Sequence, residues 1–346
     1  MNLPRASLWG LTCLFGFAAQ AAADGHAIRV PQDHATIQEA VDAASDGDRI
    51  VVDRGRRCGA TVTKRLELVG RHGATIVGCD QPVVGVLRAG FFLPDASASG
   101  TRIRGFRFDG AGVSNANLVP LALGVIARSA DGIEVTDNEF LGTIQAVTNT
   151  DGSSWHVLFN RVSKLTALTC DGQCAGGDGI VFQQRLVLAT RPTGNVAAFN
   201  RIEGAIPDGL NEFSMAGIFV LGQKAALVFG NGLAIPDNPN AAGEGDGVLV
   251  SDHCCAAVVV STSVKARVLF NDGKRSEVAV RVEADATGGL GNLEGAVIFG
   301  NRGRVELPPG APHHTWDRQL WALPDGKSLV APGRSVSASG PTQVVF

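Results

Sequence analysis

Asp178–Gln184, DGIVFQQ, and Val196–Gly204, VAAFNRIEG, form a pair of phrases that recurs through the second half of the chain. The first phrase returns as TIQAVTN from Thr143, AGIFVLG from Ala216, DGVLVSD from Asp246 and EVAVRVE from Glu277. The second returns as HVLFNRVSK from His156, ALVFGNGLA from Ala226, RVLFNDGKR from Arg267 and AVIFGNRGRVE from Ala296. Short runs rich in Val, Ile and Phe between Gly, Asn and Asp predict β-strands. One coil cannot bury its apolar side alone, so the repeat predicts a solenoid of stacked coils.

Side chains alternate between the two faces of a strand, which assigns an inner face to the first type of strand, called here the G-I-x-V strand. The residues expected to point inward and stack in successive coils are Ile180, Phe182, Ile218, Val220, Val248, Val250, Val278 and Val280.

An asparagine follows the second type of strand, called here the V-x-F-N strand, in almost every coil. Its positions are Asn138, Asn160, Asn200, Asn231, Asn271 and Asn301. Asparagine tolerates left-handed backbone geometry, and its amide can bond to the backbone of the next coil. We therefore expect a ladder of stacked amides that supports the scaffold rather than a binding function.

The opening of the solenoid is marked by VPQDHATIQEAVDAASDGDRIVVDRG from Val30. Ile37, Ala40, Val41 and Ala44 form one apolar stripe of a helix, and Gly47–Val52 is a first-strand phrase. This opening resembles pectate-lyase-like proteins of the pectin-lyase-like superfamily, in which an amphipathic helix caps the end of the solenoid. The resemblance implies an all-β, right-handed parallel β-helix with a short N-terminal capping helix. It implies no single activity, because the superfamily holds lyases, hydrolases, esterases, epimerases and non-catalytic proteins.

The N-terminus has the pattern of an export signal. Arg5 precedes an apolar run from Leu8 to Ala19, and small residues lead to Ala23, where we expect cleavage. The apolar run is too short for a comfortable membrane span, so we expect a soluble protein that is secreted or periplasmic. The predicted divisions are a signal peptide at 1–23, an N-terminal segment with the capping helix at 24–48, coils at 49–307 and a tail at 308–346 that packs on the solenoid.

Six cysteines remain after the signal peptide, which favours disulfide bonds in an exported protein. Cys58 and Cys79 are separated by about one coil, so we expect them to pair. Cys170 and Cys174 could close a local loop, and Cys254 and Cys255 could bond to each other or to that loop. A zinc site that includes His253 is the alternative, although no second Cys/His pair follows at finger-like spacing.

Long insertions precede several G-I-x-V strands, at Leu165–Gly177, Ala205–Met215 and Ala234–Gly245. Stacked coils bring these insertions to one side of the solenoid, where loops on a rigid scaffold usually bind ligands. In the proteins that the chain resembles, the substrate cleft follows this same sheet. The outward positions expected on it are Gln145, Asn149, Gln183, Arg185, Phe219, Leu221, Ser251, His253, Arg281 and Glu283.

These side chains suit an acidic oligosaccharide in an extended groove. We expect Arg185, His253 and Arg281 to be catalytic, because lysis of a uronate polymer needs a base and a group that stabilises the enolate-like charge. The side chains expected to contact the substrate are Gln183, Phe219, Ser251 and Glu283. The candidate ligands of Ca²⁺ are Asp178, Asp246 and Asp252, since Ca²⁺ needs several oxygen atoms. Simpler interpretations are an Asp that serves a turn, a loop histidine at 253, and a surface pair between Arg281 and Glu283.

The sequence lacks the phrases typical of β-helix galacturonan hydrolases, pectin methylesterases and mannuronan epimerases. The net charge of −3 comes without a basic run, which argues against a nucleic-acid partner. We therefore expect a secreted, monomeric β-helix that binds an acidic polysaccharide and cleaves it by β-elimination. The alternative is a non-catalytic β-helix that binds glycans or serves a structural role in the envelope or at the cell surface.

Overall fold

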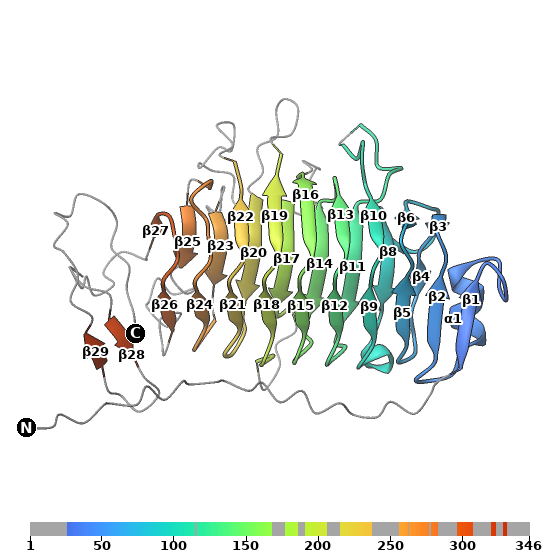
Figure 1. Ribbon diagram of the computed structural model, residues 1–346, viewed down its shortest axis with the longest axis horizontal. Helices are drawn as coiled ribbons and strands as arrows, with labels where there is room; N and C mark the ends of the chain where they lie inside the picture. Colours follow the sequence, from blue (N-terminus) through green and yellow to red (C-terminus); the bar gives the residue numbers. More distant parts are fainter. Residues whose placement is uncertain are drawn as a thin grey trace, which may run out of the picture.

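The computed structural model describes residues 26–114, 116–167, 177–185, 191–205, 215–236, 256–261, 263–276, 278–282, 296–306, 320–322 and 328–330. Over these residues the chain is a right-handed parallel β-helix, which confirms the predicted fold class. Each full coil contributes one strand to each of three parallel sheets, and the coils stack in a row from β1 to β27 (Figure 1). Parallel strands joined by crossovers adopt this right-handed course almost without exception.

The three sheets are named A, B and C. Sheet A contains β1 (Ala27–Val30), β2 (Arg49–Val52), β5 (Glu67–Gly70), β9 (Arg102–Arg104), β12 (Glu134–Thr136), β15 (His156–Leu158), β18 (Val196–Ala198), β21 (Leu227–Phe229), β24 (Arg267–Leu269) and β26 (Val297–Phe299). Sheet B contains β3 (Gly55–Cys58), β6 (Ala74–Val77), β10 (Arg107–Asp109), β13 (Glu139–Leu141), β16 (Arg161–Leu165), β19 (Arg201–Gly204) and β22 (Gly232–Ala234). Sheet C contains β4 (Ala60–Thr61), β8 (Leu87–Leu93), β11 (Leu123–Arg128), β14 (Gln145–Thr150), β17 (Gly177–Gln183), β20 (Met215–Leu221), β23 (Ala256–Ser261), β25 (Val278–Val282) and β27 (Val305–Glu306).

The glycine of the G-I-x-V strand makes room for the side chains of sheet B. A Cβ atom at Gly179 would lie 2.5 Å from the carbonyl oxygen of Gly217 and 2.9 Å from the side chain of Ile202. A Cβ at Gly124 would lie 2.5 Å from the ring of Phe140. Only glycine lets the backbone of sheet C approach these side chains so closely, and this packing requirement explains why the phrase begins with it.

The inner face of sheet C largely agrees with the prediction. Ile180, Phe182, Ile218 and Val220 are buried in the main core, and Val280 pairs with Val258 in the same inner row. On β25, Val282 points into the main core together with Val280. Val278, which was predicted to point inward, belongs instead to a separate cluster with Ala216.

The predicted sheet C strand is wrong in the coil between β20 and β25. The strand of sheet C in this coil is β23, Ala256–Ser261, which pairs with both neighbours. The prediction used the phrase from Asp246, with Val248 and Val250 pointing inward. That segment lies outside the described residues, and its place in sheet C is taken by a run of valines ten residues further along.

Asn149 was expected to point outward and instead points into the solenoid. It is buried, its Nδ2 donates to the carbonyl of Gly152 at 2.8 Å, and its Oδ1 accepts from the backbone N–H of Gly152 at 2.9 Å. The outward residues of β14 are therefore Thr148 and Thr150. Strict alternation counted from Gln145 would put both Val147 and Asn149 outward, although both are buried, because a shift of one residue reverses every face.

The predicted asparagine ladder is present and continuous. The Oδ1 of Asn160, Asn200, Asn231, Asn271 and Asn301 each accepts the backbone N–H of the ladder asparagine one coil earlier, at 2.8–3.0 Å. The Nδ2 group donates to a backbone carbonyl of the earlier coil, as Asn200 does to Val157 at 2.8 Å. Both the oxygen and the nitrogen of each ladder amide are thus hydrogen-bonded. The six buried asparagines satisfy backbone polar groups at the turns between sheets A and B.

The N-terminal end is closed by α1, Ile37–Ala43, with Ile37, Ala40 and Val41 buried as predicted. Thr36 and Glu39 form a capping box, and the Lys64 ammonium donates to three carbonyls at the end of the helix. The strand before the helix, β1, also joins sheet A, which the sequence did not indicate.

The Cys58–Cys79 disulfide is present, with Cα atoms 5.6 Å apart. It joins the end of β3 to the residues just after β6, so it ties two adjacent coils together as expected. The other four cysteines after the signal peptide lie outside the described residues, and their pairing stays a prediction.

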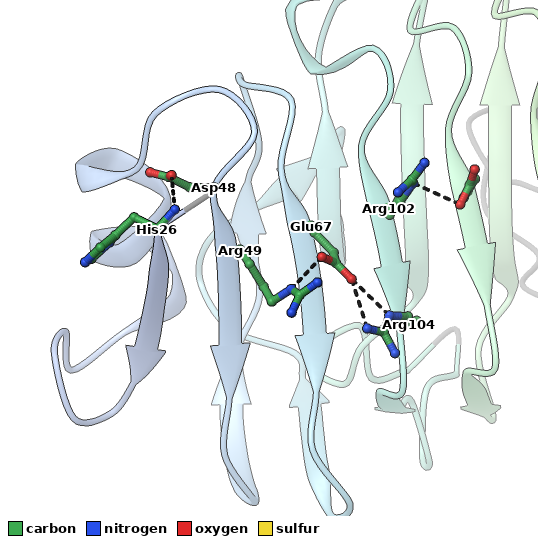
Figure 2. A network of polar contacts seen from close by, with 7 residues as sticks. His26, Asp48, Arg49, Glu67, Arg102 and Arg104 are labelled. Atoms are coloured by element: carbon green, nitrogen blue, oxygen red, sulfur yellow. Dashed lines mark hydrogen bonds and ion pairs between the residues drawn. The ribbon is translucent and has the colours of Figure 1, made fainter. Parts of the chain in front are cut away.

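An ion-pair ladder covers the outer face of sheet A in the first coils (Figure 2). Arg49, Glu67, Arg102 and Glu134 are neighbours in register on successive strands. Glu67 accepts from Arg49 and from Arg104, while Arg102 pairs with Glu134 at 3.1 Å. Burial raises the pKa of Glu67, but the hydrogen bonds from the two arginines outweigh it and leave this pKa lowered.

Few residues of the predicted tail are described. β28 (Leu320–Ala322) and β29 (Ser328–Val330) form an antiparallel pair, and the packing of the tail on the solenoid stays a prediction. Among the described residues no helix is long and apolar enough to cross a membrane. The predicted signal peptide lies outside them.

Replacing Asn200 with Ala should lower the free energy of unfolding by about 2 to 4 kcal/mol, because it leaves buried groups of Asn160 and Val157 without partners. Urea unfolding followed by circular dichroism measures the change. Asn117→Ala, the same substitution in an exposed loop, is the control and should have a much smaller effect. An equal loss in both variants would contradict a structural role for the ladder.

Replacing Glu67 with Gln should lower the free energy of unfolding at pH 7 by about 0.5 to 1 kcal/mol, since the arginines around it are about half exposed. A lowered folded-state pKa stabilises the protein above the unfolded value of about 4.3, and this contribution disappears as the pH falls through the folded-state value. The difference between the two proteins should therefore vanish in acid. Glu134→Gln, which breaks a single ion pair, should have a smaller effect.

Candidate functional site

The outer face of sheet C carries three rows of side chains that run along the solenoid. The register aligns Leu123, Gln145, Asp178 and Ala216 in the first row, Ile126, Thr148, Val181 and Phe219 in the second, and Arg128, Thr150, Gln183 and Leu221 in the third. The strands β17 and β20 begin where two of the predicted insertions end, whereas β23 begins at Ala256 and not directly after Gly245. The character of the face changes from one end of the sheet to the other.

An apolar cap covers the early part of this face. Leu123 and Ile126 of β11 pack with Leu87, Val113 and Ile144 in a cluster separate from the main core. β7 (Val83–Val84) folds back antiparallel on β8 and contributes Val84 to the cluster. The open, more polar part of the face therefore begins at β14.

Hydroxyl and amide groups line β14 and β17. The Thr148 hydroxyl donates to Oε1 of Gln145 at 2.8 Å, and Nε2 of Gln183 donates to the Thr150 hydroxyl at 3.0 Å. Gln145 and Gln183 are partly exposed, so each amide keeps capacity for another partner. Such groups bind sugar hydroxyls without a fixed charge.

Asp178 lies within this polar stretch, beside Gln145 and Ala216 in register. Burial raises the pKa of its carboxyl to about 7, and a backbone hydrogen bond from Ala216 opposes that rise. Part of the residue still reaches the surface. No cationic side chain of the described residues pairs with it, so Asp178 is a carboxyl that changes charge near neutral pH.

The predicted arginines do not gather around Asp178. Arg281 lies on the same outer face, but on β25, three strands from β17 and thus about 14 Å away. Its neighbour in register on β27 is Glu306. Arg185 follows the end of β17 and is exposed, and its backbone N–H donates to Asp151 at 2.8 Å.

Phe219 is on the outer face as predicted, and it is half-buried. It packs against Ala216 and Val278, so part of its ring contributes to a local apolar cluster rather than to an open surface. Among the substrate-binding candidates, Gln183 on β17 and Phe219 on β20 thus lie on adjacent strands of one face.

The remaining candidates lie outside the described residues. They are Asp246, Ser251, Asp252, His253 and Glu283. In the described residues, the row of Asp178 continues through Ala216 to Ala256. Among the residues that the structure describes, no group of three His, Cys, Asp or Glu side chains could hold a metal ion. The predicted Ca²⁺ site and the alternative zinc site therefore stay untested.

The sequence interpretation missed Thr148, Thr150 and Arg128. Thr148 and Thr150 were hidden by the single-residue error that placed Asn149 outward. Arg128 ends β11, which precedes the first of the repeated phrases, and its guanidinium lies 5.6 Å from the centre of the Phe92 ring. A register taken from the buried valines, rather than from the start of the strand, would have identified all three.

Comparison with known proteins supports no family assignment. No protein-family model matches the chain, and no curated protein matches it. Among solved structures, the chain is similar to the A-module of the mannuronan C-5 epimerase AlgE4 of Azotobacter vinelandii. The two share 15% sequence identity over 82% of this chain and 94% of that one, with a TM-score of 0.29. At this level we transfer no residue role or activity.

Replacing Asp178 with Asn should stabilise the protein at pH 8 and not at pH 4. The folded-state pKa is raised above the ordinary value of about 3.9, so the folded protein holds its proton more tightly and loses stability as the pH rises between the two values. We expect a gain of about 1 to 3 kcal/mol at pH 8, less than the full shift implies because the residue is partly exposed. Thermal unfolding across this pH range measures it, and an equal effect at both pH values would contradict the raised pKa.

Proposed function

We propose that the protein binds an acidic polysaccharide along the outer face of sheet C and cleaves it by β-elimination, with Asp178 as the proton acceptor. The observation that carries this proposal is the position of Asp178, a carboxyl that titrates near neutral pH within a row of hydroxyl and amide groups. A general base is most effective when its pKa lies near the working pH.

The shape of the face suits a linear polymer. Arg128 on β11 and Arg281 on β25 lie on this face five strands apart, which is about 24 Å. Gln145 and Thr150 lie on β14, the strand next to Arg128, and Gln183 lies on β17, one strand further. Guanidinium groups toward both ends favour an anionic chain, and the amides and hydroxyls between them can bind sugar hydroxyls.

The proposed reaction needs only the chain, its substrate and water. Asp178 takes the proton from C5 of a uronate, the electron pair of that bond forms the C4=C5 double bond, and the C4–O bond breaks. The departing oxygen takes a proton from water. An arginine beside the uronate carboxylate would stabilise the charge that develops there.

Ca²⁺ enters the proposal only as a test. The cation takes six to eight oxygen ligands, and Asp178 is the single carboxylate among the predicted ligands that the structure describes. Burial at Asp178 favours the protonated form, which is the opposite of what a bound cation would favour. No step of the proposed reaction therefore involves Ca²⁺.

The alternative is a non-catalytic glycan-binding protein, and one observation favours it. Arg281 is three strands from Asp178, so the described residues do not bring a base and a charge-stabilising arginine to the same sugar unit. In either case we place the protein outside the cytoplasm, secreted or periplasmic, as a monomer. The Cys58–Cys79 disulfide supports an oxidising compartment.

The deciding experiment supplies polygalacturonate, alginate and other uronate polymers and follows the absorbance of the unsaturated product. Each polymer is tested with Ca²⁺ and with a chelator. We expect activity that rises with pH through about 7 and falls at least a hundredfold in Asp178→Asn, the range typical of a removed general base. Asp137→Asn is the matched control, because Asp137 lies at a turn between sheets A and B.

Each result leads to a different conclusion. Unchanged activity in Asp178→Asn would rule out its role as base. Activity abolished by the chelator would assign Asp178 or its neighbours to a cation site instead. Binding without product across the whole panel would establish the non-catalytic alternative.

A further inference from the structure

A row of phenylalanines follows the corner between sheets A and B, on a different side of the solenoid from Asp178. Its members are Phe159, Phe199, Phe229, Phe270 and Phe299, one in each successive coil. Neighbouring ring centres lie 5.3, 5.3, 5.9 and 5.4 Å apart along the row. Phe159, Phe199 and Phe270 are 56%, 50% and 43% exposed, and they are among the most exposed large apolar residues that the structure describes.

Three of these phenylalanines have a backbone conformation that bulky residues rarely adopt. Phe159, Phe199 and Phe270 immediately precede ladder asparagines and have φ angles of 58°, 58° and 55°. The same turn is made by Asp137 in an earlier coil and by Gly230 and Gly300 in later ones. In those later coils the phenylalanine stands one residue earlier and still joins the row. Folding therefore does not require an aromatic residue at this turn, and its presence there is unfavourable for the backbone.

The outer face of sheet A beside the row changes character along the solenoid. The early strands carry the ion-pair ladder of Arg49, Glu67 and Arg102 (Figure 2). From β15 onward the corresponding positions include partly exposed apolar side chains, namely Leu158, Val196, Leu227, Leu269 and Val297. The phenylalanine row thus borders an apolar strip that spans five strands, or about 20 Å.

The charged groups around this strip are mainly cationic. Among the described residues, Arg161 on the sheet B side and Arg267 on the sheet A side are exposed and form no ion pair, while Glu139 on β13 is the neighbour of Arg161 in register. The nearby carboxylate of Glu203 pairs with Arg201 and Arg275. Asp272 lies 3.5 Å from Arg302. The strip therefore presents apolar rings together with free guanidinium groups.

We propose that the phenylalanine row is a second binding surface for a linear uronate polysaccharide, separate from the face of sheet C. Phenylalanine rings can contact the C–H groups of pyranose rings, and guanidinium groups pair with carboxylates in a planar, two-bonded geometry. The exposed rings of Phe159, Phe199 and Phe270 offer repeated contacts to a repeating polymer that lies parallel to the solenoid, whereas Phe299 at the end of the row is only 9% exposed. This surface holds the polymer whether or not the face of sheet C cleaves it.

The positive charge beside the phenylalanine row favours a uronate polymer over other ligands that could bind an apolar surface. A second copy of the chain would bring Arg161 and Arg267 against a surface of the same sign, which disfavours a symmetric dimer. A lipid surface would match the charge but has no repeat along the row. A uronate polymer satisfies both the cationic flanks and the periodic rings.

The test measures binding of polygalacturonate and alginate to the full chain by affinity electrophoresis and calorimetry. The double variant Phe159→Asn/Phe199→Asn should bind at least about tenfold more weakly, a change equivalent to about 1.4 kcal/mol. Asparagine accepts the left-handed backbone, so this variant should keep its fold and its unfolding temperature. Val86→Asn removes an exposed apolar residue on another side and is the matched control.

The outcomes separate this proposal from the one for sheet C. Undiminished affinity in the double variant would overturn the second surface, whatever Asp178 does. Full affinity in Phe159→Leu/Phe199→Leu would also overturn it, because an apolar side chain would then suffice without a ring. So would binding to vesicles of anionic phospholipid, or dimer formation, without binding to either polymer. Weaker polymer binding in the double variant, with wild-type affinity in Val86→Asn, supports the second surface independently of cleavage.

Discussion

The hydrogen bond from a ladder asparagine to the backbone of the adjacent coil is the interaction on which the rest of the solenoid depends. Each Oδ1 holds the N–H of the previous asparagine, so the height of one coil above the next is fixed at this turn. The strands of the three parallel sheets then follow in the same order from coil to coil, with a register shift between β16 and β19. Because the amides are buried, an incorrect register would leave several polar groups unpaired, and that penalty makes the stacking specific.

Glycine at the start of the sheet C strands determines what the outer face presents. The backbone at Gly179 must approach Ile202 closely, and the simple alternation of side chains is interrupted next to it. Asp178 and Val181 consequently share the outer face although they are three residues apart, as Ala216 and Phe219 do in the next coil. The close packing required at Gly179 thus places Asp178 on the outer face between neighbouring strands. Burial of its carboxyl there raises its pKa.

The repeated phrases were sufficient to predict the solenoid and the asparagine ladder, because both depend on contacts within a coil or between adjacent ones. The apolar stripe from Ile37 predicted the capping helix, and a separation of about one coil predicted the Cys58–Cys79 bond. The strand β23 could not be identified in this way, since the DGVLVSD phrase imitates the repeat while a plain run of valines fills the sheet. The site was harder still. Faces depend on a register that one irregular residue reverses, as at Asn149, and the charge of Asp178 depends on burial that no spacing reveals.

The same coil geometry has opposite consequences inside and outside the solenoid. Inside, the turn before each ladder asparagine must adopt a left-handed backbone, and Gly230 or Asp137 does so at little cost. On the outside, the left-handed backbone directs the side chain of the turn residue, the one just before the ladder asparagine, away from the core. A phenylalanine at this turn cannot contribute to the main core, so its ring gains stability only from its neighbours in the row, as Phe159 and Phe199 do. Contacts between neighbouring rings leave about half of each side chain in water, and that exposed half remains available to a ligand outside the protein.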